Sequence, residues 1–269
     1  MAQAKALVLT GHGTNCERET AHTARIAGAD SVVICHFAEL IQGLVRVAEH
    51  NFLIFPGGFL DGDHLGAAQA AAARFTYSRT PDGRPLLEEI LKLHQRGGLI
   101  LGICNGFQLL AKLGLLPSRQ DKQGQQISLS HNDSARFEDR WIHLLCDPRS
   151  PCVFTRDLHL LQMPVRHGEG KLVPRDQEVL ESLREQALIA LRYAHANGGI
   201  ASQYPANPNG SPDGIAGLSD PTGRIFGLMP HPEAFHHPTN HPAWTRAENG
   251  ALGSELFANA VSYLHALQD

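Results

Sequence analysis

The sequence predicts an α/β fold with an open, doubly wound, mostly parallel sheet flanked by helices. Three observations carry this prediction. Several short runs are apolar at every position, as strands buried on both faces of a parallel sheet are. Segments with helical spacing alternate with these runs along the chain. The first runs also end at glycine-rich loops, which are typical of strand-to-helix connections. Neither an internal repeat nor a linker divides the chain, so we expect one domain over residues 1–269.

The first half of the chain has the clearest pattern. The apolar runs predict strands over 5–9, 31–35, 51–55 and 98–103. Helical spacing predicts helices over 17–27, over the alanine-rich 67–73, over 86–95 and from Asn105 onward. Strand and helix therefore follow one another in βαβ order.

The second half is less regular. Between Pro117 and Pro174 only 141–145 is predicted, as a strand. Further strands are expected over 187–193 and 225–229, and a closing amphipathic helix over 254–267 with Ser254 as its N-cap. The proline-, asparagine- and glycine-rich segment 204–214 predicts a loop made of turns.

Composition excludes several classes of protein. With 42% hydrophobic and 19% charged residues and a net charge of −4, neither a disordered polyanion nor a basic nucleic-acid binder is expected. No apolar run is long enough to cross a membrane, and the N-terminal stretch is too short for a signal peptide, so we expect a cytoplasmic protein. The triplets that begin at Asn132 and Asn209 are then irrelevant as glycosylation sites. The five cysteines are odd in number and never form a C-x-x-C pair, which disfavours disulfides and zinc knuckles.

Cys104 is the candidate nucleophile. It stands between Gly102 and Gly106 in a G-x-C-x-G segment, where a predicted strand ends and a helical pattern begins. This is a cysteine version of the nucleophile elbow, in which glycines permit a sharp turn. The helix N-terminus would favour the thiolate, and the N–H of Asn105 would point at a developing oxyanion. The alternative is an ordinary buried cysteine.

His231 and Glu233 are the candidate base and its orienting carboxylate. They follow a predicted strand in the segment Pro230-His-Pro-Glu233, where the prolines favour extended backbone. Residues i and i+2 of an extended segment face the same side, so the carboxylate can bond one imidazole nitrogen. The alternative is a surface turn. Gly57 and Gly58, at the end of another predicted strand, would let backbone N–H groups approach the reacting centre.

Five motifs together resemble those of triad-type glutamine amidotransferases of class I, whose fold is flavodoxin-like. They are F-P-G-G-F at 55–59, G-I-C-N-G-F-Q at 102–108, P-V-R-H-G-E-G at 164–170, Y-P-A-N-P-N-G-S at 204–211 and M-P-H-P-E at 229–233. The third and fourth motifs are similar to those of one branch, the glutaminase subunits of phosphoribosylformylglycinamidine synthase in purine biosynthesis. The resemblance covers residues 5–267.

The resemblance implies a chemistry and a set of roles. Cys104 would attack the carboxamide of glutamine to give a thioester and ammonia, with His231 as acid and base and Glu233 as its orienter. Gly58 and Asn105 would supply the oxyanion hole. The substrate-side residues would be Gly57, Gln108 and His167.

The resemblance also implies partners. Ammonia would pass to a synthetase subunit that binds ATP and magnesium and converts formylglycinamide ribonucleotide to the amidine, and a small accessory subunit is expected beside it. This chain has no P-loop motif, and we expect it to hold no cofactor itself. No nucleic-acid or membrane partner is expected. Two other functions remain open: a thiol hydrolase or peptidase on the same fold, and a catalytically silent interaction subunit.

The sequence also departs from the family. Asp61 and His64 replace two tyrosines that the family commonly has after P-G-G-F, and the segments 75–85 and 236–250 are longer than in compact members. His236, His237 and His241 suggest a metal site, but prolines 238 and 242 prevent a regular helix there, so none is expected.

Overall fold

A single twisted sheet organises the molecule, for which a computed structural model describes residues 3–118, 124–246 and 250–267. The sheet has nine strands in the order β2-β1-β3-β4-β11-β10-β9-β6-β7. Its first five strands are parallel to one another, and its last four extend it through antiparallel pairs. The parallel half confirms the predicted doubly wound fold. Its strand order is that of flavodoxin-like sheets. In these sheets the direction in which successive strands are added reverses between β1 and β3.

The strands of this sheet are β1 (Lys5–Thr10), β2 (Ser31–His36), β3 (Phe52–Phe55), β4 (Leu99–Ile103), β6 (Glu138–Cys146), β7 (Leu160–His167), β9 (Leu191–Ala194), β10 (Ile215–Ser219) and β11 (Ile225–Leu228). A separate antiparallel pair consists of β5 (Ile127–Ser130) and β8 (Lys171–Pro174).

The α-helices are α1 (Glu17–Ile26), α2 (Phe37–Ile41), α3 (Gln69–Tyr77), α4 (Leu86–Gln95), α5 (Asn105–Lys112), α6 (Gln177–Glu185) and α7 (Ser254–Ala266). Four short 3-10 turns are η1 (Val47–Glu49), η2 (Pro212–Gly214), η3 (Pro232–Ala234) and η4 (Pro238–Asn240). Among the described residues, no helix is both long and apolar enough to cross a membrane.

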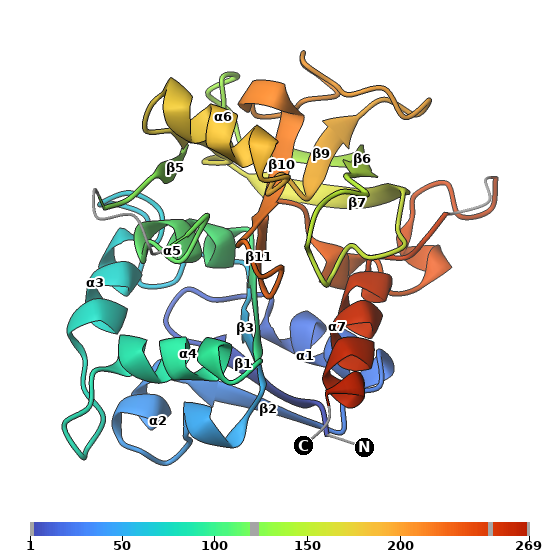
Figure 1. Ribbon diagram of the computed structural model, residues 1–269. Coiled ribbons are helices and arrows are strands. Elements are labelled where there is room, and N and C mark those ends of the chain that lie inside the picture. The colour runs from blue at the N-terminus through green and yellow to red at the C-terminus, as the bar shows by residue number, and fades with distance from the viewer. Residues whose placement is uncertain (1–2, 119–123, 247–249, 268–269) are drawn as a thin grey trace.

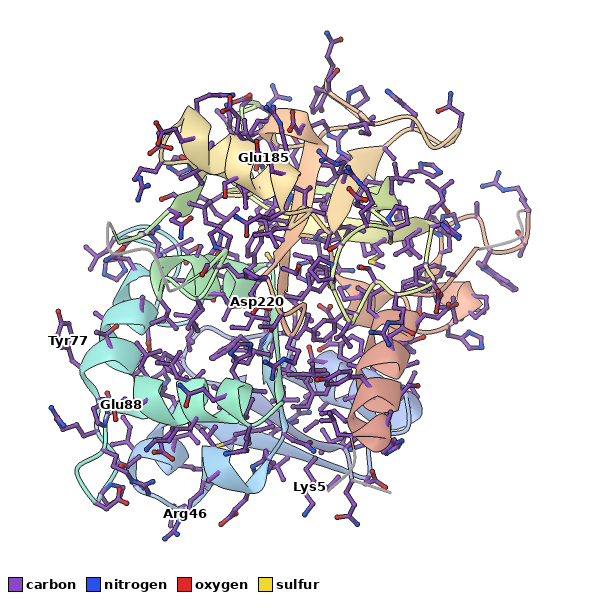
Figure 2. The ribbon with its side chains drawn as sticks, in the orientation of Figure 1. Lys5, Arg46, Tyr77, Glu88, Glu185 and Asp220 are labelled. Atoms are coloured by element: carbon purple, nitrogen blue, oxygen red, sulfur yellow. The ribbon has the colours of Figure 1, made fainter. Side chains whose placement is uncertain are left out.

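Helices cover both faces of the parallel half. Figure 1 shows α1 and α7 on one side of the sheet and α3, α4 and α5 on the other. Every residue of β3 and β4 is buried, which explains why their sequences are apolar throughout. Side chains fill the space between the layers, whereas Tyr77 extends outward from the end of α3 (Figure 2).

Most of the predicted elements of the first half are confirmed within two residues, but the predicted strand over 187–193 is too long. Ala187 has a φ of 53° and ends α6, and the N–H of Leu188 donates to Leu183 O at 3.0 Å. The chain therefore joins the sheet only at Leu191. The predicted N-cap Ser254 is also wrong. The N-cap of α7 is Gly253. A Cβ at this position would meet Pro232 O, so the position requires a glycine.

The alanine-rich segment 67–73 is only partly helical. Its first two residues precede α3, and Ala68 has a φ of 59°, so the helix begins at Gln69 and runs on to Tyr77. Besides the short 3-10 turns, five elements escaped prediction altogether: the helices α2 and α6 and the strands β5, β7 and β8. Another, β10, lies just beyond the predicted loop 204–214.

The segment 75–85 forms the end of α3 and a small turn closed by a bridge between Arg79 and Pro85. This turn borders a cavity of about 510 Å³, which we call the α4 cavity. Its lining consists of Leu40, Gln42, Gly43, Val45, Arg46, Val47, Ala48, Thr80, Pro81, Asp82, Arg84, Leu86 and Glu89. Of the other long segment, 236–250, residues 247–249 lie outside the described residues.

Candidate active site

A second cavity lies where four neighbouring parallel strands end. Loops that follow β1, β3, β4 and β11 meet there with the end of β7. Open α/β sheets bind ligands at the carboxyl ends of their strands, next to the point where strand order reverses. This active-site cavity has a volume of about 430 Å³. It is lined by Asn15, Cys16, Glu19, Gly58, Phe59, Asp63, Cys104, Gln108, His131, Phe137, Arg166, His167, Gly168, Glu169 and His231.

Cys104 occupies the turn between β4 and α5. Its φ of 51° and ψ of −103° are values that non-glycine residues rarely adopt, which is the strain expected of a nucleophile elbow. The flanking glycines permit the turn: a Cβ on Gly102 would stand 2.7 Å from Gly106 O, and a Cβ on Gly106 would collide with Phe55 O. The thiol is 6% exposed and lies 3.5 Å from Arg166 O. The predicted elbow geometry is therefore present.

His231 and Glu233 form a buried pair. The imidazole Nδ1 lies 2.6 Å from Glu233 Oε1, and the two residues are 2% and 1% exposed. Because a carboxylate only accepts, Nδ1 carries a proton and donates it to Glu233. Nε2 has no hydrogen-bond partner among the described residues. The backbone holds this segment in place, since the N–H of His231 donates to Pro164 O at 2.9 Å.

Charges around His231 favour its protonated form. Burial by itself lowers the pKa of an imidazole, but the negative charges of Glu233 and Cys104 outweigh burial and raise the pKa of His231 well above its ordinary value. The arrangement therefore favours an imidazolium in the cavity that Cys104 also lines, and the two side chains can act as a pair. Such a pair can attack an acyl carbon and then protonate the leaving group.

The loop after β3 presents a free backbone donor. Thr14 and Gly58 form an isolated bridge, whose hydrogen bonds run from Phe59 N–H to Gly13 O at 2.8 Å and from Asn15 N–H to Gly57 O at 3.5 Å. Neither of these two hydrogen bonds uses the N–H of Gly58. Asn105 is the first residue of α5, so its N–H has no partner within the helix. Both donors belong to the loops that border Cys104.

Gly57 leaves room for the imidazole of His231 and is poorly placed to contact a substrate. A Cβ at this position would lie 2.7 Å from His231 Cε1 and 3.4 Å from Cys16 Sγ. The ring of His231 therefore occupies the space that the missing side chain leaves. Gly57 does not line the active-site cavity, so substrate contact by Gly57 stays a prediction that the geometry does not favour.

Gln108 ties three parts of the cavity together. Its Nε2 donates to Glu169 O at 2.6 Å, and its Oε1 accepts from Asn105 Nδ2 at 3.0 Å. Asn105 Oδ1 in turn accepts from the N–H of Leu60 at 3.0 Å. The amide of Gln108 thus holds the protein's own loops together. Its predicted contact with substrate would use the hydrogen-bonding capacity of the amide that these two bonds leave over.

Two residues at the cavity were missed in the sequence. Cys16, at the start of α1, lies 4.0 Å from His231 Nδ1, and burial raises the pKa of its thiol. Asp63 Oδ1 is buried without a partner, and burial together with the charge of Glu169 raises the pKa of Asp63. Only the spacing of Cys16 before a predicted helix could have drawn attention to it, and nothing local marks Asp63.

No shared metal site is formed by the three downstream histidines. His236 Nδ1 lies 3.1 Å from Glu233 O, His237 caps η4, and His241 packs against Trp141 with ring centroids 4.6 Å apart. Among the described residues, one trio of potential ligands has its atoms within 4.8 Å of one another: Cys16, His231 and Glu233. His231 Nδ1 already donates to Glu233, so this geometry favours the hydrogen bond over a metal.

The loop residues that depart from the family have different environments. Asp61 adopts a φ of 60° and pairs with Arg74 of α3, whose guanidinium lies 4.0 Å from the ring centroid of Phe37. Asp61 therefore anchors the loop to α3. His64 is exposed.

Comparison with known proteins gives a consistent picture. A family model described as "CobB/CobQ-like glutamine amidotransferase domain" matches residues 3–264. The subunit PurQ of phosphoribosylformylglycinamidine synthase from Dehalococcoides mccartyi is 43% identical over 266 residues, which cover 98% of each chain. The protein of the same name from Methanococcus maripaludis is 38% identical over 275 residues and 97% of each chain. A chain in the solved structure of PurLQS from Thermotoga maritima is 27% identical, with a TM-score of 0.70 over 97% of this chain and 99% of that one.

Proposed function

Because this chain belongs to the CobB/CobQ-like glutamine amidotransferase family, we propose that it is the glutaminase subunit of a phosphoribosylformylglycinamidine synthase. It hydrolyses glutamine to glutamate and ammonia and supplies the ammonia for amidine formation in purine biosynthesis. The similarity to synthase subunits over nearly the whole of both chains supports this function. We propose that residues 1–269 form one domain, since one nine-stranded sheet contains both the first strand, β1, and the last strand, β11.

The observation that carries the chemistry is the meeting of Cys104 with the His231–Glu233 pair at one cavity. In the proposed reaction, the thiolate of Cys104 attacks the carboxamide carbon of glutamine. The N–H groups of Gly58 and Asn105 stabilise the oxyanion that forms. His231 gives its Nε2 proton to the departing nitrogen. The nitrogen leaves as ammonia, and a γ-glutamyl thioester remains on Cys104. His231 then takes a proton from water, which attacks the thioester and releases glutamate.

The proposed partners follow from the relatives. The name of the Thermotoga maritima assembly joins a Q subunit to two others, L and S, which supports a synthetase subunit and a small accessory subunit for this chain as well. We assign ATP and magnesium to the synthetase partner and no cofactor to this chain. A cytoplasmic location accords with five unpaired cysteines, because reducing compartments keep thiols free.

The deciding experiment replaces Cys104 by alanine in the complex reconstituted with the synthetase and small subunits of the same source. Glutamine-dependent synthesis should fall by a factor of about 10³ or more, while ammonia-dependent synthesis persists, because the synthetase site is untouched. Cys35→Ala changes a buried cysteine of β2 outside the cavity and should leave both rates intact. Near-normal use of glutamine by Cys104→Ala would overturn the nucleophile assignment.

Chemical labelling gives a second test of the same site. A diazoketone analogue of glutamine should alkylate Cys104 and none of the other four cysteines, as mapped by mass spectrometry of peptides. Cys16 is the stringent comparison, because it lines the same cavity but has a raised pKa and so stays a thiol. Labelling at Cys16 in place of Cys104 would reverse the assignment. Absence of any glutamine hydrolysis by the complex would favour the silent interaction subunit.

A further inference from the structure

His167 is a buried residue of the active-site cavity whose hydrogen bonding is one-sided. It ends β7, is 2% exposed and lines the cavity with Cys104 and His231. Its Nδ1 lies 3.0 Å from Asn132 Oδ1. Its Nε2 is buried and has no hydrogen-bond partner among the residues that the structure describes. One nitrogen of the ring is therefore committed and the other is free.

Asn132 decides which nitrogen carries the proton. Its Nδ2 donates to Arg136 O at 2.9 Å and to His167 O at 2.8 Å, while its Oδ1 accepts from the N–H of Gly170 at 3.0 Å. Rotating the amide by 180° would set its NH₂ against the N–H of Gly170, donor against donor. Oδ1 must therefore face His167, and only a protonated Nδ1 can donate to it. Nε2 is left as a neutral acceptor.

The backbone also holds the ring in place. A Cβ on Gly170 would lie 2.6 Å from both Cε1 and Nδ1 of His167, so this glycine lets the ring pack against the chain. Asn209, in the loop after β9, donates to Gly170 O at 2.7 Å and thereby fixes the glycine. The residue before His167 supplies the carbonyl that lies 3.5 Å from Cys104 Sγ. The free Nε2 is thus buried on a fixed ring that lines the same cavity as the nucleophile.

We propose that His167 Nε2 accepts a hydrogen bond from the carboxamide nitrogen of bound glutamine and from the ammonia that this nitrogen becomes, with Asn132 as the positioning residue that fixes the tautomer. The proposal rests on the proposed function and assigns a specificity-determining acceptor to it. A buried lone pair selects a ligand that offers an N–H, and the carboxylate of glutamate offers none. His167 would therefore favour substrate over product.

The protonation of His167 suits this role. Burial and the nearby charge of His231 lower the pKa of His167 to about 3, so the ring stays neutral in the range where enzymes of this kind work. A neutral acceptor binds ammonia through its N–H without giving it a proton. Ammonia must stay unprotonated to act as a nucleophile at the synthetase.

The test compares two substrates in the reconstituted complex: glutamine, which has an N–H donor, and γ-glutamyl methyl ester, which has none at the reacting group. His167→Leu should lower kcat/KM for glutamine by a factor of about 10 to 100 and change kcat/KM for the ester by less than about threefold. His167→Gln, which can present an oxygen near the position of Nε2, should recover part of the loss. His143→Leu, in β6 and outside the cavity, should affect neither substrate.

Equal losses on both substrates, or no loss on glutamine, would overturn the proposal, because a merely structural role does not distinguish amide from ester. Nitrogen NMR of the wild-type histidine rings at pH 7 gives an answer even if the variants fail to fold. A protonated Nδ1 and a bare Nε2 for His167 support the proposal, and a protonated Nε2 overturns it. If the wild-type complex hydrolyses neither substrate, the proposed function fails instead, and the tautomer still shows whether Asn132 fixes the ring.

Discussion

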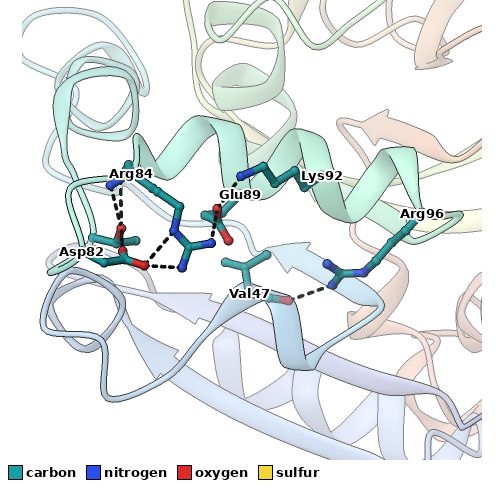
Figure 3. A network of polar contacts seen from close by, with 7 residues as sticks. Val47, Asp82, Arg84, Glu89, Lys92 and Arg96 are labelled. Atoms are coloured by element: carbon teal, nitrogen blue, oxygen red, sulfur yellow. Dashed lines mark hydrogen bonds and ion pairs between the residues drawn. The ribbon is translucent and has the colours of Figure 1, made fainter.

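Two cavities of the molecule, the α4 cavity and the active-site cavity, are similar in size and treat their charged groups in opposite ways. In the α4 cavity, Arg84 pairs with Asp82 and lies 3.0 Å from Glu89, which also pairs with Lys92 at 3.2 Å (Figure 3). The hydrogen bond from Arg84 holds the pKa of Asp82 down at about 2. In the active-site cavity, burial and the neighbouring Glu169 raise the pKa of Asp63.

The same difference holds for buried polar atoms. Asp63 Oδ1, His167 Nε2 and His231 Nε2 line the active-site cavity and have no partner among the described residues, and no such atom belongs to the lining of the α4 cavity. An unpaired buried polar group costs about 1–3 kcal/mol, and a fold keeps it where a ligand supplies the partner. Charges that neutralise one another instead stabilise a surface turn. Size alone therefore does not identify the reactive cavity.

The largest effect is expected from a change in the triad of the active-site cavity. Glu233→Gln removes the charge that raises the pKa of His231, so that pKa should fall and the imidazolium–thiolate pair should be depleted at neutral pH. We expect glutamine kcat/KM to drop by a factor on the order of 10² to 10⁴, with an unchanged circular dichroism spectrum. Steady-state kinetics across pH 6–9 measures both the loss and the shift. Unchanged kinetics would remove Glu233 from the site.

Steric displacement of His231 should have the next largest effect. Gly57 does not adopt a positive φ, so alanine fits the backbone, and the atoms nearest to its Cβ belong to the imidazole of His231 and to Cys16. Gly57→Ala should lower glutamine kcat/KM by about 10² because a displaced base is poorly aligned. The control is Gly250→Ala, whose Cβ would meet only Leu160 O at 3.9 Å, and it should behave as wild type. Full activity of Gly57→Ala would mean that the ring has room to move.

The unpaired His167 should also appear in the pH dependence of stability. Its pKa is about 3 when folded, against an ordinary value of 6.5, so below pH 6.5 the unfolded chain binds a proton that the folded chain does not. Stability is therefore lost as the pH falls, by about 2 kcal/mol between pH 7 and pH 5. Urea unfolding should show that His167→Gln lacks this part of the loss. The same pH dependence in both proteins would contradict the burial of a neutral ring.

The smallest effect is expected in the α4 cavity. Glu89→Gln weakens the ion pairs of Glu89, but none of the residues that line the α4 cavity also lines the active-site cavity. Glutamine kcat/KM should stay within about twofold of wild type, because ion pairs with the half-exposed Arg84 and Lys92 contribute little and touch no reacting group. A tenfold loss in the glutaminase assay would show that the two cavities are coupled and would break the contrast between them.

Local pattern accounts for what the sequence predicted well. The strands β3 and β4 are apolar throughout, and β1 is apolar from Ala6 to Leu9, because both of their faces are covered, and this pattern can be recognised in any short window. In the antiparallel half, strands were predicted at β6 and β9 with other bounds, and β7 and β10 were missed; β6 alternates irregularly between buried and partly exposed residues. Ala187–Ala190 reads as a strand by composition, yet a turn at Ala187 and the end of α6 decide its path.

The candidate site divides in the same way. The sequence by itself determined Cys104 on its elbow and His231 beside Glu233, because the flanking glycines permit the sharp turn and the prolines restrict the backbone within a few residues. Only the tertiary structure decided that Cys16 lies against His231, 215 positions away, and that Asn132 sets the tautomer of His167. These contacts depend on which loops the sheet order brings together, and no short segment of sequence contains that information.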